Sequence, residues 1–248
     1  MFSIKSVALK IFCSDINSIT WQSRGPLLRN NAHIYLFDIS EIDLLAETHL
    51  VTREEQSKAS LFRQDIDAKR FLAGRVFTKK ILSGILGIEP VHILIRTGKN
   101  GKPFALYNSI ELQNLCFNIS HSGNLVMIGV CSEDIGVDIE EMKPDPIVGL
   151  PATVFSKREL EVFQNSSNPL KTFYTFWTRK EAILKAIGEG LTDNLQELEV
   201  LDGTNENNLF QNTGQFIIIS FEPDAKYRAS VCVSSHIQVR FYHFCRGE

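Results

Sequence analysis

The stretch that decides the fold is Leu125-Val-Met-Ile-Gly-Val-Cys131-Ser-Glu-Asp-Ile135-Gly-Val-Asp-Ile-Glu140. Its two apolar runs, residues 125–131 and 135–140, have the length of strands and are separated by a short polar turn. Strand and helix patterns then recur on both sides of it. We therefore expect an α+β fold of two α+β lobes that meet near residue 134.

The residues before this stretch alternate between strand and helix patterns. Thr52 is followed by Glu54 and Glu55, as at a helix start, and apolar residues then recur near helical spacing. The run Gly98-Lys-Asn-Gly-Lys-Pro103 is typical of a loop. The sequence therefore predicts one or two helices over residues 52–84 and strands at residues 33–38, 91–95 and 117–119.

The residues after it show the same alternation. Gly188 follows the strongest helical pattern of the chain and should end that helix. We expect helices over residues 156–163 and 170–187, and strands at residues 198–201, 216–221, 227–233 and 238–244. Residues 1–134 and 135–248 should thus form two domains, each a small, mainly antiparallel sheet packed with helices.

Composition places the chain among soluble globular proteins, with 44% apolar and 22% charged residues. It contains no run of about 20 apolar residues that could span a membrane. The net charge of −3 disfavours a nonspecific nucleic-acid binder. The five cysteines form no Cys-x-x-Cys pair, and their odd, scattered placement indicates reduced, buried thiols in a cytoplasmic protein: Cys13, Cys116, Cys131, Cys232 and Cys245.

Two carboxylates stand in one of the predicted strands. Side chains alternate between the faces of a strand, so Asp138 and Glu140 should share one face while Val137 and Ile139 share the other. Neighbouring carboxylates repel each other, and a cation such as Mg²⁺ relieves that repulsion. The alternative is an amphipathic strand whose acidic face lies in water.

A second pair of charges stands on the predicted helix that Gly188 ends. Glu181 and Lys185 are four residues apart and should lie on one helical face. They could form a solvent-exposed ion pair. However, Trp177 and Leu184 flank Glu181 at helical spacing and should face the core, which would place the carboxylate at the edge of a cleft.

Several further polar residues are ambiguous by themselves. Phe117-Asn-Ile-Ser-His-Ser-Gly123 is expected to turn between two strands, where Ser120, His121 and backbone N–H groups could hold a phosphate. The alternative is a structural or merely exposed histidine. Lys102 in the predicted loop, and Lys58 and Arg70 in the first helical region, could equally be solvated surface cations.

Taken in order, these segments closely resemble the 4′-phosphopantetheinyl transferase superfamily. The matching motifs are Gly101-Lys-Pro103, Phe117-Asn-Ile-Ser-His-Ser122, Gly136-Val-Asp-Ile-Glu140 and Trp177-Thr-Arg-Lys-Glu-Ala-Ile-Leu-Lys-Ala-Ile-Gly-Glu-Gly190. The length matches the long, Sfp-type branch rather than the short, trimeric one. The resemblance implies a monomer of two similar α/β lobes, related by a pseudo-twofold axis, with coenzyme A between them. Nucleotide contacts would come from the N-terminal lobe, and metal and catalytic residues from the C-terminal lobe.

The resemblance also implies a role for each motif residue. Asp138, Glu140 and Glu181 would hold Mg²⁺ or Mn²⁺, and Lys185 would contact the same phosphates. Coenzyme A would further be bound by Ser120, His121, Lys102, Lys58 and Arg70, the last two near its 3′-phosphate. A serine hydroxyl of an apo acyl or peptidyl carrier protein would attack the β-phosphorus, and 3′,5′-ADP would leave.

In that reaction Glu181 would act as the base, either directly or through a metal-bound water, while Asp138 and Lys185 complete the catalytic set. Two other functions remain open on the residues alone. One is a different magnesium phosphotransferase or nuclease, which the acidic net charge disfavours. The other is a non-catalytic module that binds coenzyme A or a carrier protein, although none of the expected carboxylates or Lys185 is missing.

Overall fold

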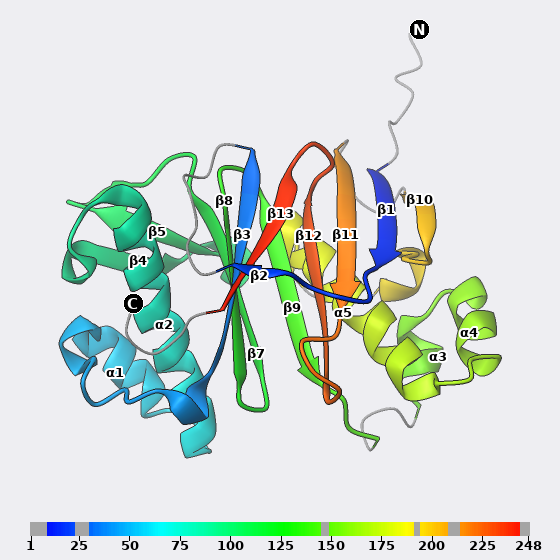
Figure 1. Ribbon diagram of the computed structural model, residues 1–248, viewed down its shortest axis with the longest axis horizontal. Coiled ribbons are helices and arrows are strands. Elements are labelled where there is room, and N and C mark those ends of the chain that lie inside the picture. Colours follow the sequence, from blue (N-terminus) through cyan, green and yellow to red (C-terminus); the bar gives the residue numbers. More distant parts are fainter. Residues whose placement is uncertain (1–8, 23–29, 145–148, 191–193, 208–213, 244–248) are drawn as a thin grey trace, which may run out of the picture. The chain divides into compact units, whose positions relative to one another are not determined.

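The structure is a computed structural model that describes residues 9–22, 30–144, 149–190, 194–207 and 214–243. Phe244 and Cys245 of the sequence analysis lie outside these ranges. The fold is α+β, with small, mainly antiparallel sheets packed with helices (Figure 1). Contacts divide the chain into two units, residues 1–19 with 134–237 and residues 20–133 with 238–248. Each unit therefore combines segments from distant parts of the sequence.

The first unit contains a five-stranded sheet in the order β10-β1-β11-β12-β9. Its strands pair antiparallel except for β1 and β11, which pair in parallel. The longest helix of the unit, α5, packs on β9 and β12. The elements are β1 (Leu9–Asp15), β9 (Ile135–Glu141), α3 (Pro151–Val154), α4 (Lys157–Gln164), α5 (Pro169–Ile187), a 3₁₀ turn (Leu195–Glu197), β10 (Gly203–Asn207), β11 (Gln215–Phe221) and β12 (Tyr227–Ser234).

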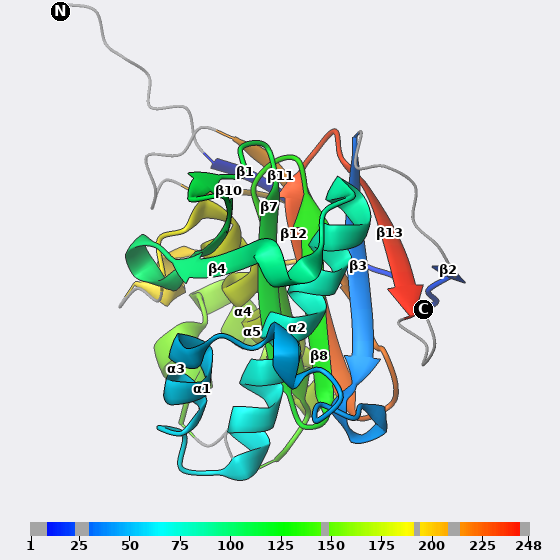
Figure 2. The same ribbon diagram turned by 90° about the vertical axis from the view of Figure 1, so that its left-hand side faces the viewer.

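The second unit contains a five-stranded sheet in the order β2-β13-β3-β8-β7 and a smaller sheet of β4, β5 and β6. Figure 2 shows α2 lying against the larger sheet. At this contact, the ring centres of Phe37 on β3 and Phe77 on α2 are 4.6 Å apart. The elements are β2 (Trp21–Gln22), β3 (Asn31–Asp38), α1 (Arg53–Ala59), α2 (Asp65–Leu86), β4 (Ile93–Thr97), β5 (Pro103–Tyr107), β6 (Ile110–Glu111), β7 (Cys116–Ser122), β8 (Leu125–Cys131) and β13 (Gln238–His243). Short 3₁₀ turns lie at Ile39–Glu41, Thr48–Leu50, Pro90–His92 and Lys99–Gly101.

The two units repeat one pattern of strand, long helix and hairpin. In the second unit this is β3, α2, β7 and β8, and in the first unit it is β9, α5, β11 and β12. In both, the last strand lies in the middle and pairs antiparallel with the first strand and with its hairpin partner. This shared topology confirms the predicted α+β fold of two similar lobes.

The repeat extends to a helix start. Thr52 caps α1 and Ser156 caps α4 through the same capping box, in which the third residue of the helix returns a side-chain hydrogen bond to the cap. Those third residues are Glu55 and Glu159. The prediction of helix starts at Thr52 and Ser156 is therefore confirmed, and both starts leave a glutamate next to the longer helix.

Each of these glutamates forms a buried ion pair with a lysine of the long helix. Lys79 Nζ lies 2.7 Å from Glu55 Oε2, and Lys180 Nζ lies 2.8 Å from Glu159 Oε2. Both lysines also donate to backbone carbonyls, Lys79 to Leu50 and Lys180 to Leu195. The pKa of Lys180 is lowered, because the effect of burial exceeds the opposing effect of the Glu159 carboxylate. The additional hydrogen bonds are what make such buried charges tolerable.

The predicted strand at residues 198–201 is wrong. These residues form no strand, although Leu198 and Val200 are fully buried, and the next strand is β10. Their backbone groups bond to side chains instead: the Leu198 carbonyl accepts from Lys180, the Val200 carbonyl accepts from Arg179, and the Val200 N–H donates to Glu159. The apolar alternation thus reflects burial over α5 without strand pairing.

The predicted turn at residues 117–123 is also displaced. Ser120 and His121 continue β7, paired with Met127 and Val126 of β8, and the turn itself is Gly123 with Asn124. Gly123 has a φ of 54°, which suits a two-residue hairpin. The strand β1 was not predicted, and residues 91–92 belong to a 3₁₀ turn that precedes β4.

Two predictions from composition can be compared with the described residues. Cys13, Cys131 and Cys232 are buried, and Cys116 is partly exposed. Within the described ranges, no helix combines the length and the apolar character needed to cross a membrane.

The buried pair of the first unit gives a stability prediction. Lys180→Met should lower the free energy of unfolding by about 3–5 kcal/mol, because it leaves the Glu159 carboxylate buried without its cation. Lys171→Met is the matched control, since Lys171 pairs with Glu222 at 2.5 Å but the two side chains are 38% and 35% exposed. It should cost less than about 1 kcal/mol. Equilibrium urea unfolding measures both, and equal losses would contradict the special weight given to Lys180.

Candidate active site

One face of β9 carries Gly136, Asp138 and Glu140, and α5 covers this face. Lys185 of α5 donates to Asp138, and Ser230, the cross-strand neighbour of Asp138, bonds to Thr178 of the same helix. Asp138 is 2% exposed. The alternative of an acidic strand face in water therefore does not hold for Asp138.

Gly136 allows the helix to lie directly on the strand. A β-carbon at this position would come within 1.8 Å of the Ala182 carbonyl oxygen and 2.5 Å of the Ala186 backbone nitrogen. These atoms belong to the helix backbone and cannot rotate away as a side chain would. The missing side chain thus sets the distance between β9 and α5, and with it the distance between their charged groups.

Lys185 spans the gap between the helix and the strand. Its ammonium donates to Asp138 Oδ1 at 2.6 Å and to the Val137 carbonyl at 3.3 Å. The Lys185 side chain is 27% exposed, whereas that of Asp138 is 3% exposed. Lys185 therefore neutralises a buried carboxylate while its own side chain remains partly exposed to solvent. A simple solvent-exposed pair with Glu181 does not describe this lysine.

Glu181 stands one helical turn before Lys185, in a partly buried position. Burial raises the pKa of its carboxyl, the Asp138 carboxylate raises it further, and Lys185 lowers it. Its Oε1 atom is buried and makes no hydrogen bond to any residue in the described part of the chain. A buried acceptor without a donor is costly, so this oxygen is suited to receive a proton or a cation.

A buried polar network anchors α5 beneath these charges. Thr178 and Ser230 hydroxyls lie 2.8 Å apart, Ser230 and Ser220 lie 3.0 Å apart, and Arg179 Nε donates to Ser220 at 2.8 Å. Arg179 further donates to Val200 O and to Asp202. None of these residues was predicted as part of the site. Their only signal was a serine at an inward position of each of two apolar strands.

The donors of this cluster suit a hard cation that prefers oxygen ligands. Glu181 offers an orphaned buried oxygen, and Asp138 lies near enough to perturb its titration. Glu140 shares the face of Asp138 and is partly buried. Among the residues that the structure describes, however, no three acidic, histidine or cysteine side chains already converge as a metal centre. The carboxylate oxygens of these residues are therefore suitable ligands for Mg²⁺. In this structure, one of the two Asp138 oxygens accepts a hydrogen bond from Lys185.

The predicted phosphate contacts of the second unit lie on and beside the β7–β8 hairpin. Ser120 is buried and His121 is exposed, as their alternation along β7 requires. Arg70 of α2 donates through Nε to the Gly123 carbonyl at 2.6 Å and through Nη1 to Asp67 at 2.6 Å. Arg70 thus holds the turn of the hairpin that carries Ser120 and His121.

The remaining predicted contacts lie at other places in this unit. Lys102 is partly buried and directly precedes β5. Lys58 is in the last turn of α1, with its ammonium 5.3 Å from the centre of the Phe71 ring. Arg75, which the sequence analysis did not identify, lies 5.2 Å from the same ring. The pKa of Arg75 is lowered, because the effect of burial exceeds the opposing effect of the Glu55 carboxylate.

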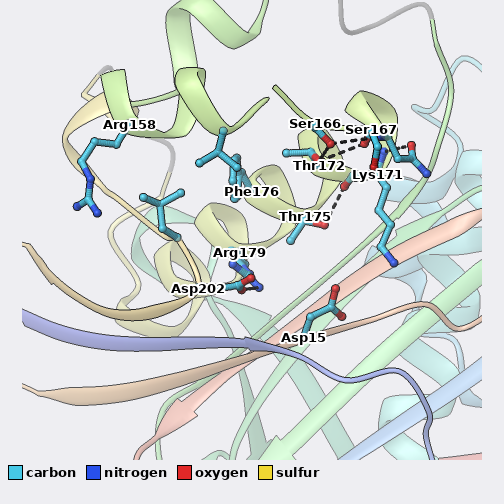
Figure 3. Close-up of a pocket in the computed structure, with 13 residues that line it drawn as sticks. Asp15, Arg158, Ser166, Ser167, Lys171, Thr172, Thr175, Phe176, Arg179 and Asp202 are labelled. Atoms are coloured by element: carbon cyan, nitrogen blue, oxygen red, sulfur yellow. Dashed lines mark hydrogen bonds and ion pairs between the residues drawn. The ribbon is translucent and has the colours of Figure 1, made fainter. Parts of the chain in front are cut away.

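A pocket of about 520 Å³ lies in the first unit, but none of Asp138, Glu181 or Lys185 lines it. Figure 3 shows Arg158 and Lys171 on opposite sides of it, with Arg179 and Asp202 between them. Each of these three cations has an acidic partner within 2.6 Å. The charges of this pocket are thus already balanced, and we place the candidate active site at the β9–α5 contact instead.

Comparison with known proteins gives two family matches. Residues 134–232 match the 4′-phosphopantetheinyl transferase superfamily, and residues 38–133 match the N-terminal region of 4′-phosphopantetheinyl transferases. The two matches meet between residues 133 and 134, where the chain passes from one contact unit to the other.

Individual relatives extend the similarity over most of the chain. The 4′-phosphopantetheinyl transferase HetI of a Nostoc species is 31% identical over 237 residues, which cover 91% of this chain and 98% of HetI. The 4′-phosphopantetheinyl transferase Sfp of Bacillus subtilis is 30% identical over 189 residues, covering 74% and 82%. The mouse L-aminoadipate-semialdehyde dehydrogenase-phosphopantetheinyl transferase is 31% identical over 171 residues, covering 64% and 55%.

The close approach at Gly136 gives a second prediction. Gly136→Ala should lower the free energy of unfolding by about 1–3 kcal/mol, because the helix must move away from the strand. Gly84→Ala is the matched control: this glycine lies inside α2 with no atom within 4 Å of an added β-carbon. It should be neutral or stabilising, by up to about 1 kcal/mol. Urea unfolding of both variants measures the difference, and a harmless Gly136→Ala would contradict the proposed spacing.

Proposed function

Because the chain belongs to the 4′-phosphopantetheinyl transferase superfamily and is a transferase of this Sfp-type branch, we propose that it modifies carrier proteins with the arm of coenzyme A. In the proposed reaction, a serine hydroxyl of an apo acyl, peptidyl or polyketide carrier protein attacks the β-phosphorus of coenzyme A. The 4′-phosphopantetheine group moves to the serine, and 3′,5′-ADP leaves.

The observation that carries this proposal is the charged cluster at the β9–α5 contact. Phosphoryl transfer is accelerated mainly by positioning and by neutralising charge on the phosphoryl oxygens. Lys185 supplies a positive charge that Asp138 holds in place at 2.6 Å. Its 27% exposure leaves the ammonium able to meet a pyrophosphate as well.

Glu181 is the proposed proton acceptor for the carrier serine. In the metal-free protein, burial and Asp138 raise the pKa of its carboxyl, which favours proton acceptance, and its buried Oε1 has no hydrogen-bond donor among the described residues. Trp177 and Leu184, one turn before and one turn after it on the helix, belong to or pack against the apolar core of the first unit. Asp138 contributes by raising that pKa and by orienting Lys185.

A magnesium or manganese ion held by Asp138, Glu140 and Glu181 would supply further positive charge to the pyrophosphate oxygens. We propose these three residues as its ligands because all offer carboxylate oxygens from two facing elements. For Lys185, the consequence is a shift of its hydrogen bonding from Asp138 toward the phosphates.

For the second unit we propose binding roles without chemistry. Ser120 and His121 would bind phosphate oxygens, and Lys102 would line the nucleotide end. Lys58 would approach the 3′-phosphate of coenzyme A. For Arg70, the bonds to Gly123 and Asp67 suggest that it acts largely by fixing the hairpin turn beside His121.

We further propose that the protein works as a monomer in the cytoplasm. Its partners would be coenzyme A and an apo carrier protein, and not nucleic acid or a membrane. The two alternatives from the sequence make different predictions. A nuclease would cleave nucleic acid in the presence of Mg²⁺, and a non-catalytic module would bind coenzyme A or carrier without releasing 3′,5′-ADP.

The decisive experiment incubates the full chain with coenzyme A, Mg²⁺ and an apo carrier protein. We expect the intact mass of the carrier to rise by one phosphopantetheine group, with 3′,5′-ADP released in equal amount. EDTA should stop the reaction, and added Mg²⁺ should restore it. The control is a carrier whose acceptor serine is replaced by alanine, which should gain no mass. Unchanged carrier mass in the complete mixture would refute the proposed function.

Glu181 and Lys185 should differ in their kinetic effects. Glu181→Gln should slow single-turnover transfer at saturating coenzyme A far more than it weakens binding, because a base acts in the transition state. Lys185→Met should also raise the dissociation constant of coenzyme A, since its ammonium meets the pyrophosphate before reaction. In the metal-free wild type, the pKa of the Glu181 carboxyl should lie above its ordinary value, because burial and the Asp138 carboxylate both disfavour its ionised form, and added Mg²⁺ should lower that pKa.

Lys157→Met on α4 is a suitable control, because it removes a lysine of the same unit that lies on an exposed helix position. Its turnover should match that of the wild type. Near-wild-type turnover in Glu181→Gln and Lys185→Met alike would mean that this end of α5 is only structural.

A further inference from the structure

Two cysteines that are distant in the sequence lie directly opposite each other in the second unit. Cys116 begins β7 and Cys131 ends β8, and the antiparallel register pairs them at the open end of the hairpin. Cys131 is fully buried, whereas Cys116 is partly exposed. The proposed transfer reaction uses neither thiol.

The backbone at this pair meets the requirement for a disulfide. Directly opposed residues of antiparallel strands have α-carbons about 4.5–5.5 Å apart, and their side chains leave the same face of the sheet. Disulfides join α-carbons that are about 4.4–6.8 Å apart. The other two described cysteines do not meet this requirement, because Cys13 and Cys232 each pair with Ile218 on the strand between them.

The position in the hairpin indicates what kind of disulfide would form. The two-residue turn closes on Ser122 and Leu125, which makes them a hydrogen-bonded pair, and the pair types alternate along the strands. Cys116 and Cys131 therefore also form a hydrogen-bonded pair, whose β-carbons are farther apart than the roughly 3.8 Å of a relaxed disulfide. A bond formed there is strained, and strained disulfides are the ones that are readily reduced.

We propose that Cys116 and Cys131 are a redox-active dithiol, a modification site that closes reversibly under oxidising conditions. The oxidant is a small disulfide of the glutathione type. The Cys116 thiolate attacks one of its sulfurs and releases one small thiol. The Cys131 sulfur then attacks Cys116 Sγ in the mixed disulfide, loses its proton and releases the second small thiol. Two protein thiols become one disulfide, and the small disulfide is reduced to two thiols.

Partial exposure gives Cys116 the first step. A small disulfide can reach this thiol, while the buried Cys131 is opposed to it and resolves the intermediate from within the sheet. Burial raises the pKa of the Cys131 thiol, so Cys116 rather than Cys131 reacts first with the small disulfide. In the second step, the departing small thiolate takes the proton that Cys131 loses.

Formation of this disulfide should change the geometry of the proposed phosphate site, an effect that rests on the proposed function. Cys116 and Ser120 lie on the same face of β7, with Asn118 between them. Drawing the two strands together at Cys116 distorts the hairpin that positions Ser120. The oxidised protein should therefore bind coenzyme A several-fold more weakly than the reduced protein.

Cleavage at methionine tests the linkage directly. The methionines are Met1, Met127 and Met142, so cyanogen bromide separates a fragment with Cys13 and Cys116 from a fragment with Cys131. After treatment with oxidised glutathione and alkylation, we expect these two fragments to remain joined until a reductant is added. Cys116→Ser should abolish the link, whereas Cys13→Ser, the matched control on the same fragment, should retain it. Separate fragments in the wild type, or a link that survives Cys116→Ser, would overturn the proposal.

Titration of coenzyme A into oxidised and reduced protein tests the coupling. We expect weaker binding only in the oxidised wild type, reversal by reduced glutathione, and no effect of the oxidant on Cys116→Ser. A linked protein with unchanged affinity would overturn the effect on the phosphate site. Failure of the proposed function appears differently, as no coenzyme A binding in the reduced protein, and leaves the fragment analysis unaffected.

Discussion

The contact on which the candidate site depends is the approach of α5 to Gly136. Because an added β-carbon would lie 1.8 Å from the Ala182 carbonyl oxygen, only glycine lets the helix backbone rest on β9. A lysine on the helix can then reach a carboxylate on the strand at 2.6 Å. With the helix one side chain farther away, Asp138 would remain buried without its cation, at a cost of several kcal/mol. The geometry of the charges is therefore a consequence of backbone packing.

The buried ion pairs explain why this helix can carry strained electrostatics. Lys180 and Glu159 fix α5 to the start of α4, and Lys79 and Glu55 do the same for α2 and α1 in the second unit. The framework is thus common to both halves of the repeat. What distinguishes α5 is the next turn, where Glu181 and Lys185 follow Lys180. A helix held rigidly by one buried pair can present neighbouring residues that are not themselves optimally solvated.

The sequence was sufficient for features with a local physical signature. The helix starts at Thr52 and Ser156 and the helix end at Gly188 depend only on neighbouring residues, and all three were predicted. The missed features depend on partners far along the chain. Residues 198–201 have the apolar pattern of a strand, but Lys180, Arg179 and Glu159 take their backbone groups. Likewise, the partner of Lys185 is on β9, while helical spacing pointed to Glu181.

The charges of the site also suggest how it would accept the polyanion of the proposed reaction. Asp138, Glu181 and Lys185 carry a net negative charge when both carboxyls are ionised, and the raised pKa of Glu181 shows the strain of that state. A proton or a cation at Glu181 removes the repulsion between the two carboxylates, and a cation that also met Asp138 would weaken its attraction for the Lys185 ammonium. Lys185 can then turn toward a pyrophosphate, since its stem is already partly in solvent. In the proposed reaction, the lysine that pairs with Asp138 would thus also meet the substrate, and the buried carboxylate would pass from one cation to another without remaining unpaired.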